Sequence, residues 1–221
     1  MLAILRPGLA YCLTGGQAVF LDLAADRYFA LSPQKTAALS ACLNEDRSQD
    51  LDPAMRYFLD EGILVPQSAE RAEADLPDIM LPARDAPPWR PRSIRPGSVA
   101  RAMAVLLASR LKQKFRPATL FADGLDSRWS KAKSGHACGA DIHDLIEAMA
   151  RAERLLPVKL NCVSRTRALK HFLKGQGIDS DMIVGVRLHP FSAHCWLQVG
   201  DMVLNDTLEG IAPYTVIRGI A

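Results

Sequence analysis

Apolar and polar positions divide the chain into three parts, of which the first predicts a small sheet followed by helices. Short apolar runs separated by turn residues predict strands at Leu9–Leu13, Val19–Asp22 and Arg27–Leu31. Ser32-Pro33 and Asp52-Pro53 each place a capping residue before a proline, which is typical of a helix start. We therefore expect one small domain at residues 1–66.

The second part, residues 67–97, carries prolines at 77, 82, 87, 88, 91 and 96. Proline fixes φ and has no backbone N–H, so this density disfavours regular structure and predicts a linker. A short flexible linker would hold the flanking domains at roughly millimolar effective concentration.

The third part, residues 98–221, changes its hydrophobic period midway. Apolar residues at helical spacing predict helices that begin at Ser98, Asp141 and Asn161. The period then becomes that of strands, which we expect at 181–188, 193–199 and 202–206. Helices followed by antiparallel strands indicate an α+β fold.

Composition is that of an ordinary globular protein, with 49% hydrophobic and 23% charged residues among 221. We expect no signal peptide, and no apolar run is long enough to predict a membrane span. Five cysteines at irregular spacings do not suggest a disulfide framework. A cytoplasmic location is therefore predicted.

Charge is distributed unevenly along the chain. Residues 1–85 hold 7 Lys or Arg against 13 Asp or Glu, whereas residues 86–221 hold 20 against 11. An acidic N-terminal part is a poor partner for a phosphate backbone, so we expect no nucleic-acid binding there.

Candidate chemistry centres on Cys162, which follows the capping residue Asn161 at a predicted helix start. Unpaired N–H groups at a helix N-terminus stabilise an anion, and a thiol is a good nucleophile only as the thiolate. His194 on a following strand would take the proton, and an acid beyond it, Asp206, would orient the imidazole.

Strand register leaves the orienting residue open. If Gly200-Asp201 forms a two-residue turn, His194 and Asp206 face opposite sides of the sheet, and Asn205 shares the face of His194. A three-residue loop or a bulge would restore Asp206. Strand register by itself therefore leaves both Asp206 and Asn205 open as the orienting residue.

The stretch LNCVSRTRALKHFLKGQGIDSDMIVGVRLHPFSAHCWLQVGDMVLND resembles the leader peptidase of lasso-peptide biosynthesis, which has a papain/transglutaminase-like core. The resemblance implies a cysteine peptidase that hydrolyses the leader–core bond of a precursor peptide with Cys162, His194 and Asp206. It implies no metal or organic cofactor, and an ATP-dependent macrolactam cyclase as a separate partner.

The N-terminal stretch FLDLAADRYFALSPQKTAALSACL resembles the PqqD-like recognition element of RiPP biosynthesis, a small winged-helix-like domain that binds leader peptides. In that family the leader adds as a strand to the edge that corresponds to Arg27–Leu31 and lies against the last helix. The implied leader-binding residues are Tyr28, Phe29, Ala30, Leu31, Tyr57, Phe58 and Glu61.

Other readings belong to different classes of protein. The same three residues could serve a transglutaminase or amidase that passes the acyl group to an amine. Alternatively, the chain could be a non-catalytic peptide- or DNA-binding protein with a winged helix in its N-terminal part. His136, Cys138 and His143 match no zinc pattern and lack a fourth ligand, so no metal site is predicted. Cys195 should point away from the face of His194 by strand alternation and be structural.

Overall fold

The computed structural model describes residues 3–44, 53–66, 80–86, 94–115, 139–156 and 159–217. Its N-terminal elements are β1 (Ala3–Leu5), β2 (Leu9–Thr14), β3 (Gln17–Asp22), β4 (Arg27–Ala30), α1 (Pro33–Asn44), α2 (Pro53–Asp60) and β5 (Leu64–Pro66). None of the helices in these residue ranges is long and apolar enough to cross a bilayer.

The N-terminal strands form a three-stranded antiparallel sheet in the order β2-β3-β4, and β1 pairs separately with β5. Gly15 and Gly16 connect β2 to β3 with Thr14 opposite Gln17, and both glycines have positive φ. Two such residues make the tight turn whose twist suits a hairpin. The strands predicted from the apolar runs are therefore confirmed, with β3 beginning two residues earlier than expected.

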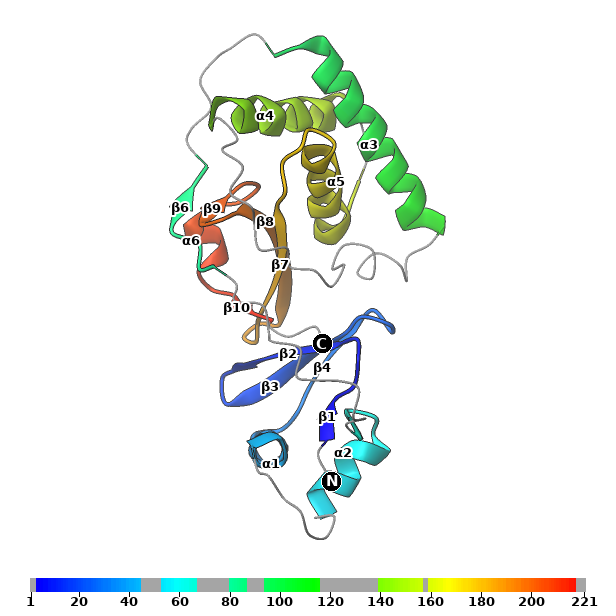
Figure 1. Cartoon of the computed structure of the whole chain (residues 1–221), viewed down its shortest axis with the longest axis vertical. Helices are drawn as coiled ribbons and strands as arrows, with labels where there is room; N and C mark the ends of the chain where they lie inside the picture. Colours follow the sequence, from blue (N-terminus) through cyan, green and yellow to red (C-terminus); the bar gives the residue numbers. More distant parts are fainter. Residues whose placement is uncertain are drawn as a thin grey trace.

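The C-terminal elements combine helices with a five-stranded sheet in the order β10-β7-β8-β9-β6. They are β6 (Arg84–Asp85), α3 (Pro96–Phe115), α4 (Gly139–Leu155), α5 (Cys162–Lys174), β7 (Asp181–Arg187), β8 (Ser192–Val199), β9 (Met202–Val203), α6 (Leu208–Ile211) and β10 (Thr215–Val216). Helix α5 lies across β7 and β8, with α3 and α4 packed around it (Figure 1). The expected mixture of helices and antiparallel strands is confirmed.

Part of the predicted linker belongs to this sheet. Arg84 and Asp85 pair in parallel with β9, and the Arg84 side chain also binds the carboxylate of Asp201 at 2.9 Å. Pro82 and Pro87 flank these residues, and the residues between them keep the N–H groups that a ladder needs. The expectation of an irregular segment throughout 67–97 was therefore wrong at β6.

Two helices begin before their predicted caps. Helix α3 begins at Pro96 and α4 at Gly139, two residues ahead of Ser98 and Asp141. Proline suits the first helical position because its φ is already helical and the missing N–H has no partner there. The proline that was assigned to the linker therefore starts α3.

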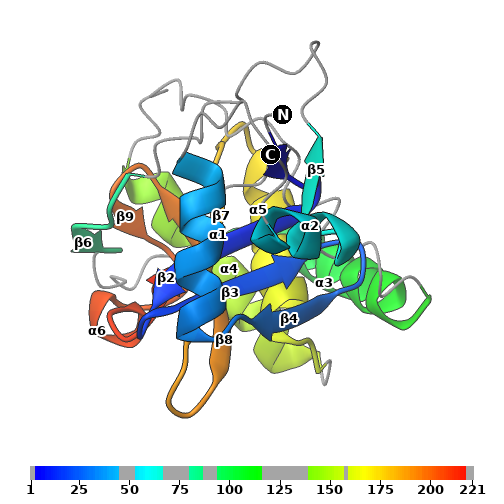
Figure 2. The same cartoon turned by 90° about the horizontal axis from the view of Figure 1, so that it is seen from below.

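The N-terminal sheet has a core on each face. Phe20 packs with α1 and α2 side chains such as Leu39 and Phe58, which form the smaller core. Its neighbours Val19 and Leu21 belong to the larger core, which lies mainly in the C-terminal part. Seen from below, α1 and α2 lie over one face of β2–β4 and the C-terminal elements lie behind the sheet (Figure 2). Alternation along β3 thus buries apolar side chains on both sides.

Further contacts join the N-terminal sheet to the C-terminal part. The Thr215 hydroxyl bonds that of Thr14 at 3.1 Å, and the Tyr28 and Phe191 rings meet edge to face with centroids 5.7 Å apart. The N-terminal sheet is therefore packed directly against the C-terminal part.

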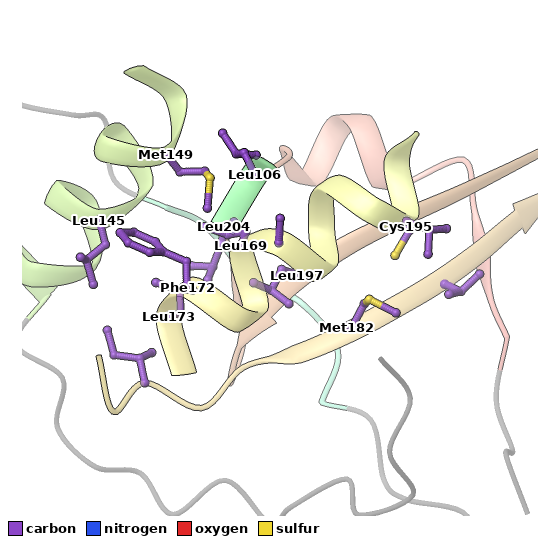
Figure 3. Packing of buried hydrophobic residues seen from close by; sticks show 14 of the residues in the cluster. Leu106, Leu145, Met149, Leu169, Phe172, Leu173, Met182, Cys195, Leu197 and Leu204 are labelled. Atoms are coloured by element: carbon purple, nitrogen blue, oxygen red, sulfur yellow. The ribbon is translucent and has the colours of Figure 1, made fainter. Parts of the chain in front are cut away.

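The larger core holds α5 in place. Leu169, Phe172 and Leu173 of α5 pack against Leu106 of α3 and Met149 of α4 (Figure 3). Each large side chain buried in this way contributes about 1.5–3 kcal/mol to stability. The start of α5 is thereby fixed beside β8.

Candidate functional site

The first turn of α5 presents the Cys162 thiol. Asn161 has extended backbone angles, and its side chain accepts a hydrogen bond from the Ser164 N–H at 2.8 Å, as an N-cap residue does. Cys162 is the first residue of the helix and is exposed. Its thiol therefore stands at the N-terminal end of a helix, where the helix dipole is positive.

His194 on β8 contacts Asp206. Its Nε2 lies 2.5 Å from Asp206 Oδ2, and the two side chains are 26% and 24% exposed. The imidazole lies near the rings of Trp196 and Tyr214, with centroids 6.1 and 5.2 Å away. A carboxylate at Nε2 leaves Nδ1 as the nitrogen that can exchange a proton with a reacting group.

Asp206 is held from its other side by the start of α6. Its Oδ1 accepts from the Thr207 N–H at 2.7 Å, and a Cβ on Gly210 would lie only 2.2 Å from that same oxygen. Glycine at position 210 is therefore what allows the carboxylate to occupy this place.

The route by which Asp206 reaches His194 differs from both expected routes. Val199 pairs with Met202, so the connection is the two-residue turn Gly200-Asp201. Strand β9 ends at Val203. The Leu204 N–H still donates to the Leu197 carbonyl at 2.9 Å, but the Leu197 N–H donates to the Asn205 side chain, at 2.7 Å, in place of a backbone carbonyl. The chain then bends, so strand alternation no longer governs Asp206; the predicted strand 202–206 was too long.

Cys162 and His194 are not hydrogen-bonded to each other in the described part of the chain. Burial, followed by the Cys162 charge, raises the pKa of Cys195 to about 12. Cys195 is thus an un-ionised buried thiol facing α5 (Figure 3), as its strand position predicted.

The predicted leader-binding residues of β4 point to different surroundings. Tyr28 packs against the C-terminal core, and burial together with the charges of Cys195 and Cys162 raises the pKa of its hydroxyl. Phe29 stacks on Phe20 at 4.9 Å on the opposite face, and Ala30 is exposed. Leu31 is buried in the smaller core.

The predicted leader-binding residues on α2 and just after it also lie in different surroundings. The Tyr57 hydroxyl accepts from Lys35 Nζ at 2.7 Å, and Glu61 is exposed just after the helix. Phe58 is 1% exposed because it fills the centre of the smaller core. Its side chain is therefore unavailable to a bound peptide.

Among the residues that the structure describes, no three His, Cys, Asp or Glu side chains come together as metal ligands. His136 and Cys138 lie outside the described residues.

A cavity of about 370 Å³ lies beside the residues that precede the α5 cap. Its lining joins apolar Leu106 and Leu160 with charged Glu153, Lys159 and Arg165. Glu153 and Arg165 form a two-pronged ion pair, so these two charges are already matched.

Comparison with known proteins decides the family. Residues 101–219, more than half of the chain, match the family model of the Transglutaminase-like superfamily. The chain belongs to the transglutaminase-like superfamily. This assignment covers all three residues of the candidate site, and it agrees with the resemblance read from residues 160–206.

A closer but shorter similarity points the same way. The chain is 42% identical over 48 residues to the Microcin J25-processing protein McjB of Escherichia coli. That match covers 22% of this chain and 23% of the relative, so the chain spans under a quarter of that protein's length. No solved structure matches the chain.

Three residues near the site were not predicted from the sequence. Thr166 bonds the Cys195 carbonyl, Gly210 makes room for Asp206, and Asp85 accepts from the Leu208 N–H at 2.6 Å. Only Thr166 left a signal, because it is a hydroxyl residue one turn after Cys162 on the apolar side of a helix. Asp85 depends on a contact with a segment far along the chain, and the need for glycine at position 210 depends on where Asp206, four residues earlier, places its carboxylate.

Proposed function

We propose that this chain is the leader peptidase of a lasso-peptide pathway, a cysteine peptidase that cleaves the leader from the core of a precursor peptide. The observation that carries the proposal is the His194–Asp206 contact in a transglutaminase-like chain that presents exposed Cys162 at a capped helix start. The similarity to a protein named for processing microcin J25 supports it.

The proposed reaction begins with proton transfer from the Cys162 thiol to His194 Nδ1, while Asp206 holds Nε2. The thiolate attacks the carbonyl carbon at the leader–core junction, and the Cys162 N–H donates to the oxygen as it becomes negative. The C–N bond then breaks, and the core amine leaves with the proton from His194. A thioester between leader and enzyme remains.

Water completes the cycle. His194 takes a proton from the water, the hydroxide adds to the thioester carbonyl, and the C–S bond breaks to release the leader acid and the thiol. None of these steps requires a metal or an organic cofactor. A separate ATP-dependent cyclase would then close the macrolactam on the freed amine, in the reducing cytoplasm where Cys162 stays a thiol.

Leader capture is assigned to the outer edge of β4. β4 ends the order β2-β3-β4 and has no partner beyond it among the described strands. A peptide strand added there would gain main-chain hydrogen bonds, with side chains such as Ala30 and Tyr57 for selectivity. Phe58 and Leu31 would act through the core beneath this surface.

The test is cleavage of a synthetic peptide that spans the leader–core junction of a lasso-peptide precursor. Cys162→Ala should lower turnover by at least about 10³-fold and leave leader affinity within about twofold, because the two sites use different residues. Cys42→Ala, a half-buried cysteine in α1, is the matched control and should cleave normally.

Mass spectrometry of the products separates the alternatives. Addition of water to the leader supports the peptidase. Transfer of the leader acyl group to an added amine at the expense of water would assign an acyl transferase instead, and full activity of Cys162→Ala would remove the cysteine mechanism.

A further inference from the structure

A chain of side-chain hydrogen bonds joins three segments of the candidate site. The Thr166 hydroxyl donates to the Cys195 carbonyl at 3.0 Å and accepts from Asn205 Nδ2 at 3.0 Å. Asn205 Oδ1 in turn accepts from the Leu197 N–H at 2.7 Å. One hydroxyl and one amide thus connect α5, β8 and the segment after β9.

Each end of this bridge lies next to a proposed catalytic residue. Thr166 follows Cys162 by four residues, which is about one turn of α5. Cys195 directly follows His194, and Asn205 directly precedes Asp206. A shift of any one segment against the others would therefore change the separation of thiol, imidazole and carboxylate.

The position of Thr166 is costly for a polar side chain unless its bonds are made. Thr166 is 1% exposed, and Val163 and Leu169, three residues before and after it on α5, belong to the larger apolar core, as does Cys195, whose carbonyl it bonds. A buried hydroxyl without partners destabilises a protein, whereas a fully bonded network in a low-dielectric interior is rigid. Valine would fill the same space, so packing alone does not explain why a hydroxyl side chain occupies this position.

We propose that Thr166 and Asn205 are positioning residues, whose hydrogen-bonded side chains set the distance and orientation among Cys162, His194 and Asp206. The inference rests on the proposed cysteine-peptidase function, because it concerns the geometry of that site. Asn205 therefore acts through the backbone of β8 and through Thr166, and does not contact His194 in place of Asp206.

Iodoacetamide is a suitable probe, because it reacts with the thiolate and needs no knowledge of the precursor. The alkylation rate of Cys162, followed near neutral pH by peptide mass spectrometry, should fall about 10- to 100-fold in Thr166→Val, since displacement of about 1 Å disrupts a catalytic pair. Thr166→Ser restores the hydroxyl and should stay within about threefold of the native rate.

Thr36→Val provides the matched control. Thr36 is also buried, and its hydroxyl accepts from the Ala18 N–H at 2.9 Å far from the site. It should lose thermal stability to a similar degree as Thr166→Val without changing the Cys162 rate. Equal slowing in both threonine variants would mean that the effect is general loosening, which overturns the positioning role.

Asn205→Ala and His194→Ala complete the test. The half-buried Asn205 tolerates truncation better than Thr166, and Asn205→Ala should slow alkylation as Thr166→Val does even if the latter does not fold. If His194→Ala slows alkylation and both Asn205→Ala and Thr166→Val react normally, only the positioning role is wrong. If His194→Ala itself reacts at the native rate, the proposed thiol–imidazole pair is wrong.

Discussion

At the scale of single residues, the site depends on how closely side chains approach the Asp206 carboxylate. Oδ2 contacts His194, while Oδ1 lies where a Cβ on residue 210 would be. Gly210 does not have a positive φ, so backbone strain is not the reason for glycine here. The close approach of the carboxylate is the reason.

Gly210→Ala is therefore expected to separate activity from stability. Alanine favours a helix over glycine by about 1 kcal/mol, and this gain offsets the crowding of the capping Thr207 Oγ1, which would lie 3.2 Å from the new Cβ. The new methyl group would displace Asp206 and release the imidazole, and we expect peptide cleavage to fall about 100-fold. Kinetics and thermal unfolding of the same samples measure the two effects.

Gly97→Ala serves as its control, because nothing lies within 4 Å of a Cβ at this position in the first turn of α3. This variant should cleave at the native rate. Native activity in Gly210→Ala would show that the carboxylate is not needed at that place.

At the scale of elements, the start of α5 combines a helix cap with the exposed thiol of Cys162. The Asn161 side chain satisfies the Ser164 N–H and sets the direction in which the helix begins. Loss of the Asn161 side chain should therefore affect both the stability of α5 and the position of the Cys162 thiol. The two effects can be told apart by comparison with another helix.

Asn161→Ala should cost about 0.5–2 kcal/mol of unfolding free energy and slow alkylation of Cys162, whereas Asn161→Ser keeps a capping oxygen and should restore both. Ser32→Ala removes a cap from α1, where Ser32 Oγ accepts from the Lys35 N–H. It should lower the unfolding free energy without altering Cys162. Chemical denaturation and alkylation kinetics are the measurements. Unchanged alkylation of Cys162 in Asn161→Ala would show that the cap does not influence the reactivity of the thiol.

The individual helices and strands differ in how far they could be predicted from the sequence. Caps, apolar periodicity and the Gly-Gly turn are local, so α5, β2 and β3 were readable from neighbouring residues. Strand β6 was not, because its partner β9 lies more than a hundred residues away. Asp206 was placed on the correct side only by resemblance, since the alternation rule stops where the Asn205 side chain replaces a backbone bond.

At the scale of the whole molecule, the N-terminal sheet is held on both faces. Val19 and Leu21 belong to the larger core, and Tyr28 meets Phe191 three residues before His194. This packing differs from two domains joined by a loose tether. The edge of β4 should then lie at a constant distance from Cys162. Under the proposed function, the length of peptide between the leader-binding segment and the cleaved bond would therefore be fixed.

Insertions in the peptide substrate distinguish a fixed distance from a tether. Two or four glycines between the leader-binding segment and the junction should slow cleavage at the native bond by more than about tenfold, because the reacting carbonyl no longer reaches its place. A flexible tether would change the rate by less than about twofold, since effective concentration falls only as roughly the −3/2 power of length. The same glycines placed before the leader-binding segment are the control and should have no effect. Cleavage displaced along the peptide by the inserted length would still fit a fixed distance, whereas native rates at the native bond would favour the tether.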